Sequence, residues 1–375
     1  MSSWFSSASA LPFPAEPVVR VADPATSSVS TSTPLLINSL AASPDDFKWR
    51  LNVPSATEAF TFYLTLSNGT YVLAQMVYSA VGLSPSVQMT LRMYNSDKTK
   101  YASTLSPSMS NFKVSDDKLS VTCDQMQFTY NPATRGYTLV FDLGVNVAAV
   151  NVLLTPTDAP FKVNDGRLPF GAKDSDGFVD AAFYPRHEAT GTISFEGKTT
   201  NVVGWGSSSH VIQYKPQVPA KWNFVNLQNE KDAIMLYEFD LPKGGKCTSI
   251  GTVVRNGRTI AVTTTNRSVH VQKQNDSKFS GYDVPTQLFV VLNGKTQDLG
   301  EDVHVEISIV QKNLLDAIDV LAQLPYLLKV FIQTFITAPY VYQWYEDVSA
   351  KVTIGKDSFT VDGKAFIECA FLLKE

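Results

Sequence analysis

The acidic residues between positions 174 and 180 are the part of this chain that most resembles a metal-binding motif. Asp174, Asp176 and Asp180 offer the carboxylate oxygens that Ca²⁺ prefers. The spacing of a calcium loop is absent, because Gly177 directly follows Asp176 and no suitably placed bidentate glutamate completes the loop. We therefore expect a solvated turn here.

Histidines, cysteines and catalytic motifs give no sign of another reactive centre. No two of the four histidines share a metal-ligand spacing: His187, His210, His270 and His304. The three cysteines are widely separated and odd in number, which supports neither a disulfide framework nor a thiolate zinc site and indicates a reducing compartment. The sequence contains no Gly-x-Ser-x-Gly elbow, no Gly-x-Gly-x-x-Gly turn and no phosphate loop. We expect no catalytic residue, no metal and no cofactor.

Composition and charge restrict the class of partner. The 375 residues can form two domains, with 44% hydrophobic residues, 18% charged residues and a net charge of −4. A nucleic-acid-binding protein would show a basic stripe, and the 31 basic and 35 acidic residues are thinly spread. The start of the chain lacks a basic region followed by a long apolar run, so we expect a cytoplasmic protein, with the nucleus left open as a second compartment.

Period-two alternation dominates from residue 45 onward. Phe60, Phe62 and Leu64 alternate with Thr61 and Tyr63, and similar runs recur at 87–94, 137–143 and 303–309. Turn signals separate such runs, among them Ser-Asn-Gly-Thr at 67–70 and Arg-Asn-Gly-Arg at 255–258. No long helical pattern intervenes before residue 311, so we predict antiparallel sheets.

The domain boundaries follow from composition. Residues 1–44 are rich in Ser, Thr, Ala and Pro, which predicts a disordered or weakly amphipathic tail. Pro216 and Pro219 mark a linker before a new series of strands opens at Lys221. We predict domains at 45–219 and 220–375, each a β-barrel that either fills with side chains or holds one small ligand.

An apolar segment near the C-terminus breaks the strand pattern. Leu314, Ile318 and Leu321 recur at helical spacing, and more apolar residues follow Pro325. We predict a helical insertion at about 311–337 that either packs over the end of the barrel or acts as a gate at a membrane. The segment also contains acidic residues, Pro325 and Lys329, which argues against a membrane-spanning helix.

Several separated segments, in a fixed order, carry a resemblance to a known family. They read DFKW at 46–49, EAFTFY at 58–63, LAQMVYS at 73–79, FYPR at 183–186, GTI at 191–193, KWNFVNLQ at 221–228, IDVLAQLP at 318–325 and PYVYQ at 339–343. In these segments the chain resembles the fungal survival factor family, which pairs two lipocalin-like domains within a wider calycin-like group. It departs from the family pattern at 179–181 and 215–218, where histidines of that pattern are absent. This departure predicts a changed ligand specificity.

The resemblance implies an all-β fold of two tandem lipocalin-like (calycin-like) antiparallel β-barrels. It also implies a lipid-binding and lipid-transfer protein that supports survival under oxidative stress, with ceramide or a related sphingolipid as cargo. The partners implied are a hydrophobic small molecule or lipid and, transiently, the surface of the endoplasmic reticulum or Golgi. We expect no nucleic-acid partner.

A lipid carrier needs an apolar cavity with a few polar groups and a cover. Our candidate ligand-binding residues are Phe183, Tyr184, Arg186, Trp205, Trp222, Leu328, Phe331, Tyr340, Tyr342 and Trp344. Ordinary core packing is the alternative for the aromatic residues. Arg186 could instead form an interdomain salt bridge.

The N-terminal segment offers candidate membrane-contact residues, because it carries no charged side chain before Glu16. They are Trp4, Phe5, Leu11 and Phe13, which could insert weakly at an interface. A tail without function is the alternative.

Two other functions stay open from the sequence. One is a cofactor-independent cavity enzyme, an isomerase, hydratase or cyclase, acting on a hydrophobic metabolite through orientation in the cavity. The other is a scaffold protein with filled barrels. We expect a binding protein rather than an enzyme.

Overall fold

The computed structural model of the chain describes residues 41–81, 84–97, 99–242, 248–278, 280–320 and 339–373, without the side chains of 163–165. These residues belong to one compact unit. The predicted membrane-contact residues Trp4, Phe5, Leu11 and Phe13 lie outside the described residues, as do Leu328 and Phe331.

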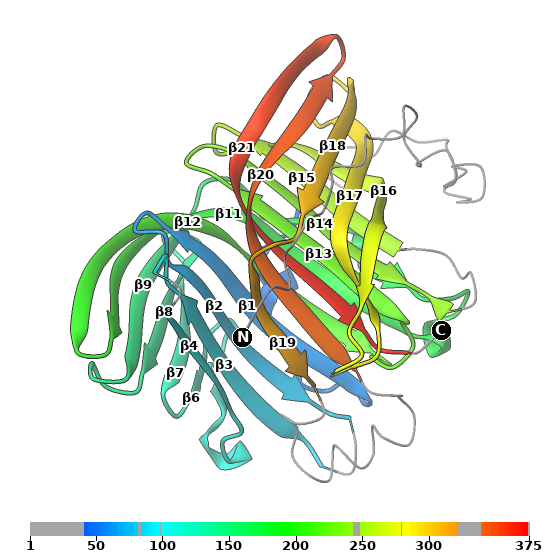
Figure 1. The fold of residues 1–375 in the computed structure, drawn as a ribbon. Coiled ribbons are helices and arrows are strands. Elements are labelled where there is room, and N and C mark those ends of the chain that lie inside the picture. Colours follow the sequence, from blue (N-terminus) through cyan, green and yellow to red (C-terminus); the bar gives the residue numbers. More distant parts are fainter. Residues whose placement is uncertain are drawn as a thin grey trace. The chain divides into compact units, whose positions relative to one another are not determined.

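The first sheet contains twelve strands within the described residues and is strongly curled (Figure 1). Its strands are β1 (Ala56–Leu66), β2 (Tyr71–Ser79), β3 (Ser86–Tyr94), β4 (Lys100–Leu105), β5 (Lys113–Val114), β6 (Val121–Cys123), β7 (Met126–Asn131), β8 (Gly136–Asp142), β9 (Ala148–Pro156), β10 (Phe161–Pro169), β11 (Phe178–Phe195) and β12 (Lys198–Tyr214). Three 3₁₀ turns lie beside them: η3 (Pro44–Phe47), η4 (Met109–Asn111) and η5 (Asp174–Asp176). The order across the sheet is β4-β3-β2-β1-β12-β11-β9-β8-β7-β6-β5, with β10 paired to β11.

The second sheet closes into an eight-stranded antiparallel barrel. Its strands are β13 (Lys221–Gln228), β14 (Ala233–Asp240), β15 (Thr248–Arg255), β16 (Arg258–Asn275), β17 (Asp283–Thr296), β18 (Asp302–Val310), β20 (Tyr340–Ile354) and β21 (Asp357–Phe371). Consecutive strands pair from β13 to β18, β13 also pairs with β21, and the β18–β20 pairing completes the ring. A ninth strand, β19 (Leu314–Asp319), pairs with β20 outside the ring.

The alternation in the sequence predicts these strands correctly. Phe60 and Phe62 of β1 point into the curled sheet, whereas Thr61 and Tyr63 point out of it. Both predicted hairpin turns are confirmed, since β2 follows β1 after residues 67–70, and Asn256 and Gly257 between β15 and β16 adopt positive φ values of 50° and 76°. All strand pairs among the described residues are antiparallel, as expected.

The prediction of two closed barrels is wrong for the first sheet, which is a curled half-barrel. Its two edge strands, β4 and β5, do not pair with each other. Strand β4 keeps the half-exposed, largely polar side chains typical of a sheet edge, and it begins at the exposed Lys100. The division into domains at 219 and 220 stays a prediction, although the half-barrel ends at Tyr214 and the barrel starts at Lys221.

The helix predicted at 311–337 is also wrong for its first residues. Leu314–Asp319 is the strand β19, and residues 311–313 are irregular, with the Glu346 carboxylate accepting hydrogen bonds from the N–H groups of Lys312 and Asn313. Six residues are too few for periodicity to distinguish a helix from a strand, so pairing with β20 decides. Residues 321–338 lie outside the described part of the chain. Within that part there is no α-helix, and hence none long and apolar enough to cross a membrane.

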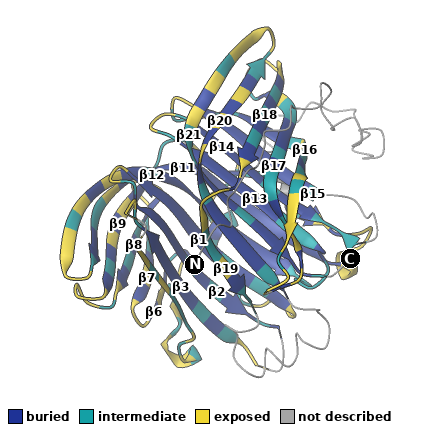
Figure 2. Ribbon diagram, viewed as in Figure 1, coloured by how far each residue is buried: buried dark blue, intermediate teal, exposed yellow. Residues whose placement is uncertain are grey.

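Three apolar clusters hold this architecture together. One fills the concave side of the half-barrel, a second fills the barrel, and a third lies between the convex side of the half-barrel and the outside of the barrel. The third cluster is aromatic: Tyr71 stacks on Phe366 with ring centroids 4.8 Å apart, and Tyr63 lies 4.7 Å from Phe224. Figure 2 shows the strands buried along most of their length and the tips of the β11–β12 and β20–β21 hairpins exposed.

A buried ion pair fixes the segment that leads into β1. The Glu58 carboxylate accepts hydrogen bonds at 2.8 Å from the N–H groups of Arg50 and Leu51 and lies 2.9 Å from His210 Nε2. Burial alone would raise the pKa of Glu58, but the contacts with His210 and these two N–H groups outweigh it and hold the pKa below its ordinary value. The second ring nitrogen of His210 lies 3.2 Å from the carbonyl oxygen of Asp46. Both ring nitrogens of His210 thus lie within hydrogen-bonding distance of an oxygen atom.

Candidate functional site

A cavity of about 330 Å³ lies between the convex side of the half-barrel and the outside of the barrel. Strands β1 to β4 and β12 form one side, which we call the sheet wall. Strands β13, β14, β19, β20 and β21 form the other side, which we call the barrel wall. The cavity therefore lies outside the concave side of the half-barrel and outside the interior of the barrel, because side chains fill both.

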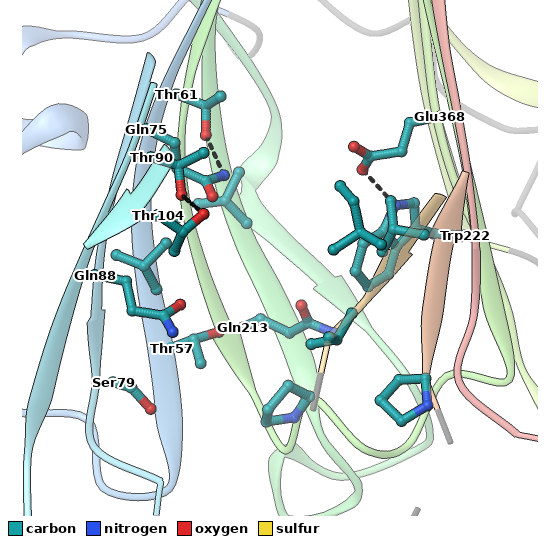
Figure 3. A pocket seen from close by; sticks show the side chains of 18 of the residues that line it. Thr57, Thr61, Gln75, Ser79, Gln88, Thr90, Thr104, Gln213, Trp222 and Glu368 are labelled. Carbon is teal, nitrogen blue, oxygen red and sulfur yellow. Dashed lines mark hydrogen bonds between the residues drawn. The ribbon is translucent and has the colours of Figure 1, made fainter. Parts of the chain in front are cut away.

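Apart from Arg92, the polar groups that line the sheet wall are uncharged hydroxyls and amides (Figure 3). Gln75 Nε2 donates to Thr61 Oγ1 at 2.8 Å, and the hydroxyls of Thr90 and Thr104 lie 3.2 Å apart. Each of these pairs joins neighbouring strands, because residues on the same face of paired strands lie opposite one another. Between the polar groups lie small and branched apolar side chains: Ala59, Val77 and Val211.

The barrel wall is mostly apolar, with one carboxyl group. Trp222, Tyr237, Ile318 and Val341 line it, and Glu368 of β21 projects among them. Trp222 Nε1 donates to Glu368 Oε1 at 2.9 Å, a contact drawn in Figure 3. Burial raises the pKa of the Glu368 carboxyl, and the hydrogen bonds it accepts only partly offset this.

A further set of connected polar groups lies around Glu368. Gln343 Nε2 donates to Glu368 Oε2 at 2.7 Å, and Tyr94 Oη lies 3.4 Å from Gln343 Oε1. Arg92, whose side chain is only 5% exposed, forms an ion pair with Asp316 of β19. Among the described residues that line the cavity, Arg92 is the one arginine, and the Asp316 carboxylate of β19 neutralises it.

Both residues that flank segment 321–338 line the cavity. Val320 follows β19 and Pro339 precedes β20. Residues 321–337 of the predicted insertion lie outside the described part of the chain, so packing over the end of the barrel and gating both stay predictions.

Of the candidate ligand-binding residues that the structure describes, Trp222 lines the cavity and the others lie elsewhere. Phe183 packs between the half-barrel and the barrel, 5.2 Å from Phe161 and 5.9 Å from Tyr237. Tyr184 points to the opposite side of its strand and lies 4.5 Å from Phe47 in the half-barrel core. Adjacent residues of a strand face opposite sides, so these two side chains cannot share one cavity.

The aromatic candidates of β20 belong to the cluster that fills the barrel or pack against it. Tyr342 and Trp344 stack 6.0 Å apart inside the barrel, and the Tyr342 hydroxyl lies 2.7 Å from Ser280 Oγ. Tyr340 packs at the edge of the same cluster, 6.5 Å from Tyr282. The cavity is instead lined by the residues between them, Val341 and Gln343.

Arg186 connects the half-barrel to the barrel. Its guanidinium donates to Gln228 Oε1 and to the Asp232 carbonyl oxygen, both at 3.2 Å, and to the Glu230 carbonyl oxygen. The partners are an amide and two carbonyls rather than the carboxylate of a salt bridge. Trp205 lies 5.9 Å away and borders a separate, shallow surface hollow with Gln228.

Two of the acidic residues at 174–180 form ion pairs, the exposed Asp174 and the buried Asp180. Asp180 pairs with Arg50 and Arg167, each at 2.7 Å, and Asp174 pairs with Arg167. Across the described residues, no group of three or more His, Cys, Asp or Glu side chains is placed to hold a metal ion. The interpretation as a turn is confirmed by η5, which spans Asp174–Asp176.

Sequence reasoning missed Glu368, Gln343 and Arg92. One signal was present for Glu368, the only charged residue in the apolar run at 365–372. Arg92 follows Gln88 and Thr90 at alternate positions of β3, which marks a polar face but not what that face meets.

Comparison with known proteins places the chain among named relatives. It is 29% identical over 357 residues to ceramide-binding protein svf1 of Aspergillus fumigatus, covering 88% of this chain and 89% of the relative. It is 27% identical over 386 residues to ceramide-binding protein svf1 of Schizosaccharomyces pombe, covering 99% and 100%. Among solved structures, a putative AttH from Nitrosomonas europaea shares the fold with a TM-score of 0.58 at 13% identity, covering 90% of this chain and 98% of that one. The Svf1 family model matches residues 2–373, so the chain belongs to the Svf1 family.

Proposed function

We propose that the chain binds a ceramide-like lipid in the cavity between the half-barrel and the barrel, and carries it between membranes. The observation that carries this proposal is the composition of the two walls. Hydroxyl and amide groups line the sheet wall, and apolar side chains line most of the barrel wall. A lipid with a hydroxylated amide head and hydrocarbon chains presents the same two kinds of surface. The names of the relatives support the choice of cargo.

The size of the cavity indicates which part of a lipid it surrounds. Its volume of about 330 Å³ is at the lower end of the range for ligand pockets, roughly 300–1,000 Å³. The described walls therefore suit the polar group and the adjoining parts of the chains rather than a whole two-chain lipid.

Mass spectrometry of bound lipid tests the proposal. Ala59 is half-buried and faces the cavity between Val77 and Val211 of the adjacent strands, so Ala59→Trp places an indole ring within it. The matched control is Val203→Trp, because Val203 is 55% exposed and does not line the cavity. We expect co-purified ceramide in the wild type and in the control and none in Ala59→Trp. Equal lipid in all three proteins would refute a site in this cavity.

The stress role proposed from the family likeness has a test in cells. If survival under oxidative stress depends on lipid handling, then cells lacking the gene should regain peroxide resistance from the wild type and Val203→Trp. Ala59→Trp should not restore it. Full rescue by Ala59→Trp would separate the stress role from the cavity.

We also propose peripheral membrane association through Trp4 and Phe5, because an uncharged aromatic segment inserts weakly at an interface. Trp4→Asp together with Phe5→Asp should release the protein from floated vesicles without changing the amount of bound lipid. Unchanged flotation of this variant would exclude these two residues as the contact.

A cavity enzyme is the second candidate, and Glu368 is the observation that favours it. A carboxyl group whose pKa burial raises is suited to deliver a proton to a substrate. Such an enzyme would form a product that disappears in Glu368→Gln, whereas a carrier would release its cargo unchanged.

A further inference from the structure

Glu368 occupies an unusual position on the outside of the barrel. Along β21 the side chains of Ile367 and Cys369 point into the barrel, and Glu368 between them points to the half-barrel. It is partly exposed, and the space it is exposed to is the cavity.

The Glu368 carboxyl group is held in place by two donors. Trp222 donates to one oxygen at 2.9 Å and Gln343 to the other at 2.7 Å. Tyr94 in turn approaches the Gln343 amide oxygen at 3.4 Å. Each carboxyl oxygen keeps further hydrogen-bonding capacity that these donors do not use. A fixed carboxyl group with unused capacity beside a cavity is suited to bind a polar group of a ligand.

No cation neutralises this carboxyl group directly. Among the described residues Glu368 forms no ion pair, and the nearest influence of a cation comes from Arg92, which is paired with Asp316. The other titratable groups that face it are tyrosines: Tyr63 from β1, Tyr71 from β2, Tyr94 from β3 and Tyr237 from β14. Burial raises the pKa of all four phenols, so they stay uncharged at neutral pH.

The protonated carboxyl group complements a ligand that carries an amide and an alcohol, because it offers a donor and acceptors to the acceptor and donors of that ligand. Its O–H can donate to a carbonyl oxygen, and its remaining lone pairs can accept from a hydroxyl or amide N–H. Among the described residues that line the cavity, Arg92 is paired with Asp316, so a phosphate or carboxylate head would meet no unpaired cation from them and would have to lose its hydration, which is strongly unfavourable. The cavity therefore discriminates by charge as well as by shape.

We propose that Glu368 is the polar anchor of the cavity, held in place by Trp222 and Gln343. In its protonated form it selects uncharged lipids with amide and hydroxyl groups over phosphorylated lipids. Ionisation of Glu368 weakens the binding of the uncharged lipids. The proposal rests on lipid binding in this cavity, as proposed above. It assigns a specificity-determining residue and a pH dependence to that site.

The test compares two substitutions of the same side chain. Glu368→Gln keeps the shape and the donor but cannot ionise, and Glu368→Leu removes all polar atoms. The probes are a fluorescent ceramide and the same ceramide phosphorylated on its hydroxyl, titrated into purified protein between pH 5.5 and 8.5. The matched control is Glu306→Gln, which neutralises a carboxyl group that lies beside His304 and does not line the cavity.

At pH 5.5 we expect Glu368→Leu to bind ceramide at least about tenfold more weakly and Glu368→Gln to bind within about threefold of the wild type. As the pH rises, the wild type should lose affinity relative to Glu368→Gln, and the Glu306→Gln control should follow the wild type. Phosphorylated ceramide should bind all of these proteins at least about tenfold more weakly than ceramide does.

Three results would overturn the anchor. The first is that Glu368→Leu binds ceramide as tightly as the wild type. The second is that raising the pH does not weaken ceramide binding by the wild type relative to Glu368→Gln. The third is that phosphorylated ceramide binds as tightly as ceramide. Ala59→Trp separates this failure from that of the proposed function. If Ala59→Trp binds ceramide like the wild type, the cavity is not the lipid site at all. If Ala59→Trp abolishes binding while the Glu368 variants behave like the wild type, only the anchor is wrong.

Discussion

Arg186→Met tests whether this arginine joins the half-barrel to the barrel or binds ligand. Arg186 is 3% exposed, and its guanidinium donates to Gln228, Glu230 and Asp232 near the turn between β13 and β14. Methionine keeps much of the aliphatic volume but none of these hydrogen bonds.

The expected magnitude follows from these contacts. Hydrogen bonds that involve a charged group contribute about 1.5–3 kcal/mol each. These values are already net of desolvation, and bonds that share one guanidinium do not add in full. We therefore expect a loss of about 3 kcal/mol in the free energy of unfolding. Arg186→Lys should lose about 2 kcal/mol, because a single ammonium cannot reach all three acceptors as the planar guanidinium does.

Urea denaturation followed by tryptophan fluorescence and by circular dichroism measures this loss. The matched control is Arg258→Met at an exposed arginine, which should change stability by less than about 0.5 kcal/mol. Ceramide binding by folded Arg186→Met should match the wild type, since Arg186 does not line the cavity. A variant of wild-type stability that binds ceramide tenfold more weakly would refute the structural role and restore Arg186 as a ligand-binding residue.

Three further predictions concern the buried ionisable groups. Glu58→Gln should lower the free energy of unfolding at pH 7 by about 2–3 kcal/mol, because the carboxylate accepts hydrogen bonds from two backbone N–H groups and contacts a histidine. The deficit should shrink below about pH 4, where the wild-type carboxylate becomes protonated. Denaturation curves that show a deficit independent of pH would contradict this. Burial raises the pKa of Glu368, so the stability of the wild type should fall as the pH rises through that pKa. Glu368→Gln should therefore become more stable relative to the wild type as the pH rises. Parallel curves of stability against pH for the two proteins would count against a titrating carboxyl group. Burial raises the pKa of Cys123 to about 11 and raises that of Cys369 further. A Cys247→Ser variant should therefore show no reactive thiol in a native thiol assay at pH 8 and two reactive thiols in denaturant. Rapid reaction of either thiol in the native protein would argue against this burial.

Local signals in the sequence were sufficient for the strands and turns. Alternation along β1 and β18 predicted which side chains face a core, and Asn256 and Gly257 predicted a tight hairpin. These predictions succeed because strand periodicity and turn conformation depend on neighbouring residues. The predicted helix failed at β19 because a six-residue apolar segment fits both periods and its pairing partner, β20, lies more than twenty residues away.

The candidate site was harder to predict, because most of its residues look ordinary in the sequence. Trp222 was identified as a large aromatic residue, whereas Thr61 and Gln75 were not among the candidates. Tyr342 and Trp344 drew attention by their size but fill the barrel. Residue type alone does not distinguish an aromatic side chain that fills a core from one that lines a cavity.

The sequence by itself determined an all-β chain with antiparallel hairpins, a strand-rich second half beginning at Lys221, and membership of its family through ordered motifs. Only the tertiary structure decided that the first sheet stays open, that β19 is a strand, and that the cavity lies between the outer faces of two sheets. The physical reason is that alternation specifies two faces for every strand but not what each face will meet. Glu368 becomes a candidate anchor because the half-barrel packs over it and removes most of its water, and that contact joins residues more than 250 positions apart in the chain.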